Sequence, residues 1–280
     1  MKRVLLLYFL LTGCNHIPDI QWDNELIDGR LMYGHVPPNT QIYVDNTTKN
    51  NGTKGLETLP IKDGNFVVGI PQDSKQLRLK IKKDGKIKDL VFNVSPRKWQ
   101  EDYVSGLPPK KVNPPPEEQT RIQSEFKKMR QKRQLSDFNQ FPNQWQRPLP
   151  SYKRISSPFG SRRILNGIVK QGHSGTDYAA DTGTPVLAAA DGKVVLTHTD
   201  MFYTGGTILV DHGYGVYTSY AHLSQIDVKE GQTIKRGDTI GAVGMTGRAT
   251  GPHLHFGVSW YGVRLDPEDL FNQIKSSNAN

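Results

Sequence analysis

The sequence has a single cysteine, Cys14, so no disulfide can form within the chain and secretion would bring no disulfide scaffold. It also lacks very long apolar runs: the stretch 4–11 is far shorter than the roughly 20 residues that a membrane-spanning helix needs. Acidic residues are in deficit, with 27 Asp and Glu against 36 Lys and Arg, a net charge of +9. This balance favours anionic partners such as a cell wall, membrane headgroups or nucleic acid. No basic cluster is interleaved with aromatic residues, so we expect no nucleic-acid partner.

The first residues have the pattern of a secretion signal. Lys2 and Arg3 precede the short apolar stretch, and Leu11-Thr12-Gly13-Cys14 then resembles a bacterial lipobox, in which the cysteine is lipidated and becomes the mature N-terminus. An ordinary signal peptide with an incidental cysteine is the alternative, but the small residue directly before the cysteine favours the lipobox. We therefore predict a lipoprotein signal peptide over 1–13 and a membrane anchor on Cys14. Asn15, by the habit of such lipoproteins, hints at sorting to the outer membrane, with the protein facing the periplasm.

Residues 14–107 are predicted to form an N-terminal all-β domain. Asp63-Gly64 and Asp84-Gly85 lie between short apolar or alternating stretches, as in β-hairpins. In the arm 77–82, Leu and Ile alternate with Arg and Lys, which gives a strand with one apolar and one basic face. We interpret the basic face as the solvent side of a sandwich, with binding to an anionic wall as the alternative. No catalytic group of residues is found in this half.

Residues 108–150 are predicted to be a proline-rich linker that contains one helix. The stretch 117–134 is rich in helix formers, with acidic residues at its start and basic residues at its end, as the helix dipole prefers. Ile122, Phe126 and Met129 recur at helical spacing and form a narrow apolar stripe. We expect this stripe to pack on one of the two domains, and a regulatory latch near a site is the alternative.

Residues 151–280 are predicted to form a second, larger domain of short strands and glycine turns. No helical period is evident over 152–263, and 267–274 is compatible with a short final helix. The predicted fold class is therefore mainly β: an antiparallel β-rich domain, preceded by a small β-sandwich-like domain and a helical linker.

One stretch organises this domain, Gly251-Pro252-His253-Leu254-His255-Phe256-Gly257-Val258. As a strand, it places Leu254, Phe256 and Val258 on one face and both histidines on the other. A helix would separate the two rings by about 200° around its axis. The strand therefore presents two imidazoles side by side, next to a glycine-rich loop that lets the backbone approach whatever they hold.

Three further residues can join this pair. In His173-Ser174-Gly175-Thr176-Asp177, an imidazole and a carboxylate share one face if the segment is extended, and His222 follows later. Nitrogen and oxygen side chains of this kind suit zinc. Any one of these histidines is more simply explained as a partly buried, hydrogen-bonded side chain, but the set is not. We interpret His198 and His212 as structural. The candidate set is His173, Asp177, His222, His253 and His255.

These motifs together resemble the lysostaphin/LytM-type zinc metallopeptidases. The likeness extends over about 156–267 and includes Ser157-Pro158-Phe159-Gly160-Ser161-Arg162 and the loop before the His-x-His strand. The resemblance implies Zn²⁺ as cofactor, with His173, Asp177 and His255 as its ligands and an open position for water. It leaves His222 and His253 as catalytic residues with undivided roles. It also implies peptidoglycan as partner and hydrolysis of its peptide cross-links as function; partners in cell division or wall synthesis stay unknown.

Other interpretations stay open at this point. His253 could be a fourth ligand and close the site into a structural one. The chain could be a non-enzymatic wall-binding protein or an activator of other wall hydrolases, although its ligand residues are intact. Two segments, 188–194 and 228–234, look like those of biotinyl or lipoyl carrier barrels, but the candidate ligands have no place in such a function. The bond that is cut is also undetermined: an outer-membrane setting suggests the D-alanyl–diaminopimelate cross-link, and polyglycine bridges fit a different wall.

Overall fold

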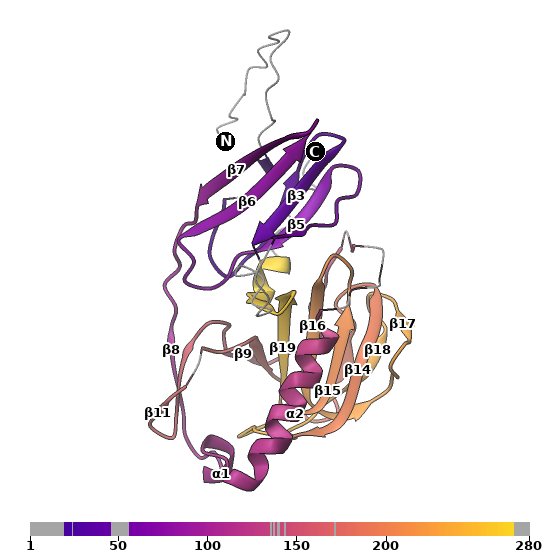
Figure 1. Ribbon diagram of the computed structural model, residues 1–280. Helices are drawn as coiled ribbons and strands as arrows, with labels where there is room; N and C mark the ends of the chain where they lie inside the picture. The colour runs from indigo at the N-terminus through magenta and orange to yellow at the C-terminus, as the bar shows by residue number, and fades with distance from the viewer. Residues whose placement is uncertain are drawn as a thin grey trace.

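A computed structural model describes residues 20–23, 25–45, 56–134, 136, 138, 141–142, 144–170 and 172–271. The predicted signal peptide and Cys14 lie outside these residues. Within the described part, no helix is both long enough and apolar enough to cross a membrane. Figure 1 shows two β-rich bodies, one above the other, with the helix α2 lying along the lower one. The mainly β fold class predicted from the sequence is confirmed.

The N-terminal domain consists of two small sheets that enclose a shared core. Its clearest strands are β6 and β7, which the Asp84-Gly85 turn joins, with both turn residues at positive φ. The predicted alternation in β6 is present, because Leu77, Leu79 and Ile81 are buried. One sheet has the order β1-β2-β5 and the other β4-β3-β6-β7. The strands are β1 Gln21–Trp22, β2 Leu31–His35, β3 Thr40–Asp45, β4 Leu56–Thr58, β5 Asn65–Gly69, β6 Gln76–Lys83 and β7 Lys86–Asn93.

The C-terminal domain is built around one large antiparallel sheet. Its central path has the order β17-β14-β15-β16-β19-β12-β9, and β13, β18 and β20 join it at the side. A short helix follows over 267–271, where the sequence suggested one. The strands are β9 Arg154–Ser157, β12 Thr176–Ala179, β13 Pro185–Leu187, β14 Gly192–Met201, β15 Gly205–Asp211, β16 Val216–Ile226, β17 Thr233–Ile234, β18 Thr239–Val243, β19 His253–Trp260 and β20 Val263–Leu265.

The two domains share one hydrophobic core. Gly69 of β5 lies against Trp260 at the end of β19, where a β-carbon on the glycine would be 2.8 Å from the Cβ atom of Trp260. Buried residues of both domains form a single cluster. Arg97 also pairs with Asp266, with Nη1 and Oδ2 2.8 Å apart. The N-terminal domain is therefore fixed at the end of β19 that lies away from His253.

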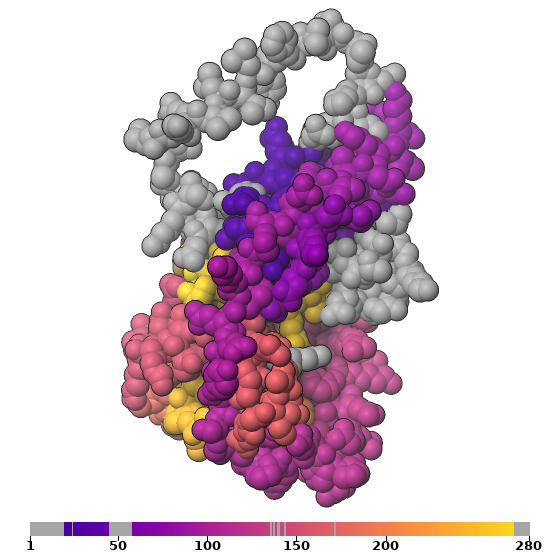
Figure 2. All heavy atoms as spheres, turned by 90° about the vertical axis from the view of Figure 1, so that its left-hand side faces the viewer, coloured from indigo at the N-terminus to yellow at the C-terminus, as the bar shows by residue number. Residues whose placement is uncertain are grey.

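The chain between the domains contributes to the second one before the linker begins. The strand β8, Glu101–Val104, pairs in parallel with β10, Arg162–Leu165, which in turn pairs with β11, Ile168–Val169. In Figure 2 the purple chain that leaves the N-terminal domain runs down onto the larger domain. The boundary at residue 107 stays a prediction, but β8 belongs by its hydrogen bonds to the sheet of β10.

Two helices follow β8: α1, Pro109–Val112, and α2, Pro116–Lys132. The longer one agrees with the predicted helix, and its apolar stripe is only partly covered. Ile122 and Met129 are buried, whereas Phe126 is 54% exposed. Met129 packs against β14, β15 and β16 through Leu196, Met201, Leu209 and Tyr217, so α2 packs on the C-terminal domain (Figure 1).

Candidate metal centre

The pairing of β12 with β19 brings the central candidates together. The register is antiparallel and places Asp177 opposite His255, and Ala179 opposite His253. Leu254, Phe256 and Val258 are buried on the core face of β19, as the alternation predicts. The imidazole and the carboxylate therefore extend from the other face, where Nδ1 of His255 lies 2.7 Å from Oδ1 of Asp177.

His173 reaches the same point from the loop that precedes β12. Its Nε2 lies 3.1 Å from Oδ1 of Asp177 and 3.0 Å from Nδ1 of His255. The ligand atoms of all three side chains lie within 4.8 Å of one another. Each of these side chains is at least seven-eighths buried. Two nitrogens and one carboxylate oxygen thus converge in a small, largely enclosed space.

The hydrogen bonds of His173 indicate what this convergence is suited to hold. Its Nδ1 lies 3.1 Å from the carbonyl oxygen of Pro158, which can only accept, so Nδ1 carries the proton. Nε2 then directs a lone pair toward a carboxylate oxygen. Two facing acceptors need a cation between them, and a His₂-carboxylate donor set is one that zinc uses in catalytic sites. The residues present therefore fit a divalent metal.

The pKa values of these groups keep them in the forms that bind metals. Burial lowers the pKa of His255 to about 4, although Asp177 opposes this shift. Burial alone would raise the pKa of Asp177, but His173 and His255 hold it well below its usual range. At neutral pH the site therefore offers a neutral imidazole and a charged carboxylate, and neither has to lose a proton before a metal binds.

His222 is aimed at this site by an unusual backbone conformation. It lies on β16, where Ala221 pairs with His255, and has a φ of 63°, which is in the left-handed region. Its backbone NH donates to the carbonyl oxygen of Thr204 at 2.8 Å, outside the ladder with β19. A non-glycine residue keeps this conformation only where the surrounding structure holds it in place. Residues of this kind cluster at functional sites.

His222 and His253 have the same tautomer for the same reason. Nδ1 of His222 donates to the carbonyl oxygen of Thr246 at 2.7 Å, and Nδ1 of His253 donates to that of Gly251 at 2.8 Å. The two rings lie 4.6 Å apart, centroid to centroid. Burial, followed by the neighbouring His253 and His255, lowers the pKa of His222 to about 3. Both Nε2 atoms are thus unprotonated in the neutral rings and available to accept a proton.

The structure therefore assembles all five predicted residues but groups only three of them. Nε2 of His253 is 3.9 Å from Oδ1 of Asp177, and it is not part of the close cluster. His212 lies elsewhere, fully buried, with Nδ1 2.7 Å from the carbonyl oxygen of Asp191 and Nε2 2.7 Å from Oγ1 of Thr218. His198 accepts from the backbone NH of Asp200 on the β14 strand. Neither belongs to the site.

Sequence reasoning missed the polar residues behind the cluster. Arg163 of β10 donates through Nη2 to Oδ2 of Asp177 at 2.5 Å, and Ser157 Oγ lies 2.9 Å from Nδ1 of His173. Asp102 of β8 accepts a hydrogen bond from Ser157. No pattern in the sequence links Asp102 to the others, because it lies 55 residues before Ser157 and in the predicted N-terminal domain.

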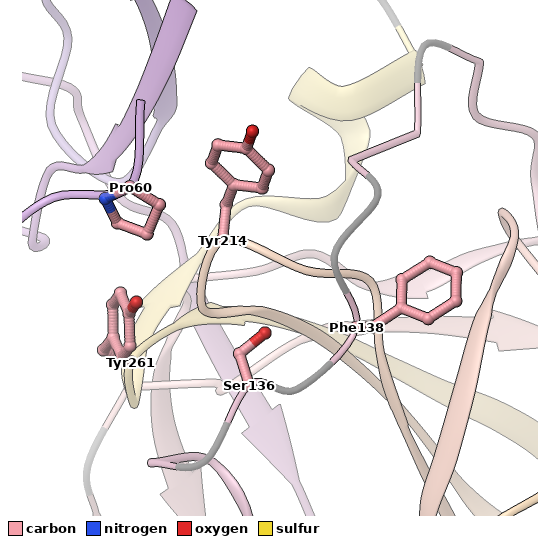
Figure 3. A pocket seen from close by; sticks show the side chains of 5 residues that line it. All are labelled: Pro60, Ser136, Phe138, Tyr214 and Tyr261. Atoms are coloured by element: carbon pink, nitrogen blue, oxygen red, sulfur yellow. The ribbon is translucent and has the colours of Figure 1, made fainter. Parts of the chain in front are cut away.

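A separate pocket lies where the two domains meet, near the end of β19 that is away from His253. It is lined by Pro60, Ser136, Phe138, Tyr214 and Tyr261 (Figure 3). Tyr261 directly follows β19, whereas His253 begins it. At about 3.3 Å per residue, the pocket is about 25 Å from the histidine cluster and is no part of it.

Residues 171–267 match the model of peptidase family M23. The peptidoglycan DD-endopeptidase ShyA of Vibrio cholerae is 48% identical over 111 residues, which are 39% of this chain and 25% of that protein. An uncharacterised metalloprotease of Haemophilus influenzae is 39% identical over 122 residues, or 43% of this chain and 26% of that protein. The chain thus spans about a quarter of the length of these relatives.

One solved structure extends the likeness to the N-terminal half. A crystal structure from Pseudomonas aeruginosa, assigned to peptidase M23, superposes with a TM-score of 0.65 and 29% sequence identity. The match covers 89% of this chain and 96% of that one. Both the domain with the histidine cluster and the domain before it therefore have a counterpart there. By this match and its motifs, the segment 171–267 is a peptidase M23 domain of the lysostaphin/LytM type.

Proposed function

We propose that the protein is a zinc-dependent endopeptidase that hydrolyses peptide cross-links of bacterial peptidoglycan. The observation that carries this proposal is the juxtaposition of a three-ligand cluster and two imidazoles whose Nδ1 atoms donate to backbone carbonyls. His173, Asp177 and His255 supply the ligand atoms, while His222 and His253 present free Nε2 atoms beside them. Relatives named as a DD-endopeptidase and a metalloprotease support the same reaction class.

The chemistry divides between the metal and the two histidines. Zinc held by His173, Asp177 and His255 would lower the pKa of a bound water molecule to about 7 and polarise the scissile carbonyl. One of the two free imidazoles takes the proton of the attacking water through Nε2. The proton that it takes can then pass to the leaving amine, directly or through the other ring, which lies 4.6 Å away, centroid to centroid. Amide hydrolysis then proceeds without a covalent intermediate.

The substrate that we propose is the D-alanyl–diaminopimelate cross-link. The test is digestion of purified peptidoglycan of this chemistry, and of a wall with polyglycine bridges, with identification of the fragments by mass spectrometry. We expect cross-linked dimers of the first wall to become monomers, and zinc removal by a chelator to stop the reaction. A metal-loaded protein that binds the wall but releases no fragment would instead be a non-enzymatic wall-binding protein or activator.

We also propose that the protein is a lipoprotein, anchored through Cys14 in the outer membrane and facing the periplasm. The support is the sequence alone: a basic start, a short apolar stretch and the lipobox-like Leu11-Thr12-Gly13-Cys14. Cys14→Ser should release the protein from membrane fractions or block its maturation. A mature native protein whose intact mass contains no acyl chains would contradict the proposal.

A further inference from the structure

A carboxylate from outside the matched M23 segment lies directly behind the cluster. Asp102 is on β8, and its Cα partner in the parallel ladder is Arg163 of β10. Both side chains are more than four-fifths buried. A pair of this kind is costly to enclose unless its members have further polar partners. Here those partners are residues that touch the candidate ligands.

The first connection leads to His173. Oδ2 of Asp102 accepts the hydroxyl proton of Ser157, so the Ser157 oxygen is left with its lone pairs. That oxygen lies 2.9 Å from Nδ1 of His173, which carries a proton because it also faces the carbonyl oxygen of Pro158. The carboxylate thus orients the hydroxyl, and the hydroxyl accepts from the imidazole. The lone pair of Nε2 is thereby kept toward the cluster.

The second connection leads to Asp177. Nη2 of Arg163 donates to Oδ2 of Asp177 at 2.5 Å and to Oγ of Ser157 at 3.1 Å, while Nε of Arg163 lies 3.7 Å from Oδ2 of Asp102. Since Oδ2 of Asp177 is occupied, Oδ1 faces the two histidines. The guanidinium would repel a metal cation placed there, and the charge of Asp102 offsets it.

We propose that Asp102 is a positioning residue of the metal centre, acting through Ser157 on His173 and through Arg163 on Asp177. This inference rests on the proposed metal binding. It implies that the centre is completed by a strand that precedes the residues matched to the family, so the segment between the two domains is part of the site. Partners behind metal ligands commonly change metal affinity by 10- to 100-fold.

The experiment compares Asp102→Asn, Ser157→Ala and the double variant with the native protein. Zn²⁺ affinity is measured by competition with a chromophoric chelator, the absorption spectrum of the Co²⁺ form reports ligand geometry, and the Tm of the metal-free form reports the fold. We expect each single variant to weaken Zn²⁺ binding by 10- to 100-fold and to change the Co²⁺ spectrum. The double variant should be no weaker than Asp102→Asn, because Asp102→Asn already interrupts the connection that passes through Ser157.

Glu101→Gln is the matched control. Glu101 neighbours Asp102 on β8, but its side chain is exposed and lies 3.6 Å from that of Arg162. We expect native affinity and an unchanged Co²⁺ spectrum. An Asp102→Asn protein whose Zn²⁺ affinity is within twofold of the native value would overturn the proposal.

Two other outcomes have to be distinguished from a loss of Zn²⁺ affinity that is specific to Asp102→Asn. Should Asp102→Asn lower the Tm of the metal-free form, Ser157→Ala decides, and native affinity there overturns the proposal. Should the native protein itself bind no Zn²⁺, the proposed function fails first, and with it the inference. Native binding that Asp102→Asn leaves unchanged removes only the role of Asp102.

Discussion

Gly175 lies so close to Phe256 that a β-carbon on the glycine would be 2.4 Å from the Phe256 carbonyl oxygen. The contact is between the start of β12 and the middle of β19, next to the pair formed by Thr176 and Phe256. Gly175 is two residues from each of two candidate ligands, His173 and Asp177. The missing side chain therefore lets the segment with these ligands approach the strand that holds His255.

Replacing this glycine should weaken metal binding. In Gly175→Ala the added carbon meets backbone atoms, which cannot rotate away, so β12 must shift relative to β19. We expect the Zn²⁺ affinity to fall at least tenfold and the Tm to decrease, as titration and thermal unfolding will show. Gly251→Ala is the control, because a β-carbon there meets no atom within 4 Å. Equal Zn²⁺ affinities for the two variants would contradict this account.

The two histidines of β19 should respond differently to removal. His255→Ala removes an atom of the close cluster, so zinc content and turnover should fall together. His253→Ala should keep most of the zinc and lower hydrolysis by roughly 10²–10⁴-fold, the usual range for losing a general acid or base. The measurements are elemental analysis and turnover on peptidoglycan for each purified variant.

His222→Ala provides a second comparison, because its ring has the same tautomer as that of His253 and lies beside it. We expect it to retain zinc and to lose turnover to a similar degree. If His253→Ala instead loses zinc as readily as His255→Ala, both rings of β19 are ligands, and the open site proposed above is wrong.

Local periodicity accounts for what the sequence could predict about this site. The alternation of Leu254 and Phe256 with two histidines is a property of neighbouring residues, so the shared face of His253 and His255 was predictable. Asp102 was not, since the ladder that places it opposite Arg163 joins strands about 60 residues apart.

The backbone conformation of His222 could not be predicted from the sequence either. A positive φ is expected of glycine, and nothing in Tyr220-Ala221-His222-Leu223 indicates one. It arises where the strand β16 leaves its regular ladder with β19. The coarse fold was predictable because turns such as Asp84-Gly85 and the strand alternation are local signals, whereas pairings such as β8 with β10 depend on tertiary packing.

The helix α2 offers a stability test with an internal control. Met129 is 9% exposed and packs against Leu196, Met201 and neighbouring residues of the C-terminal domain. Met129→Ala should lower the free energy of unfolding by about 2–3 kcal/mol, at the low end for buried Met because the site is at the edge of the core. Phe126→Ala, on the same stripe but 54% exposed, should cost less than about 1 kcal/mol. Urea unfolding of both variants tests this difference. Equal losses of unfolding free energy would show that the whole apolar stripe stabilises α2 on the domain.

His212 should make stability depend on pH. Burial lowers the pKa of this imidazole to about 4, from an ordinary value of 6.5. Between these two values the unfolded chain binds more protons than the folded one, so the free energy of unfolding rises with pH. The contribution is complete above pH 6.5 and is lost as the pH falls to about 4. A shift of this size corresponds to about 3 kcal/mol for a fully buried group.

The variant His212→Gln isolates this contribution. Its side chain cannot titrate, so the difference in unfolding free energy between native and variant proteins should shrink by about 3 kcal/mol as the pH falls from 7 to 4. Other groups cancel in this difference: metal-free His222 and His255 have the same sign, and Asp266, whose pKa burial raises to about 6, has the opposite one. Urea unfolding with a chelator present, at several pH values, is the measurement. If the unfolding free energies of the two proteins changed with pH in parallel, His212 would be protonated equally in the folded and unfolded chains. Its contacts with Thr218 and Asp191 would then survive protonation.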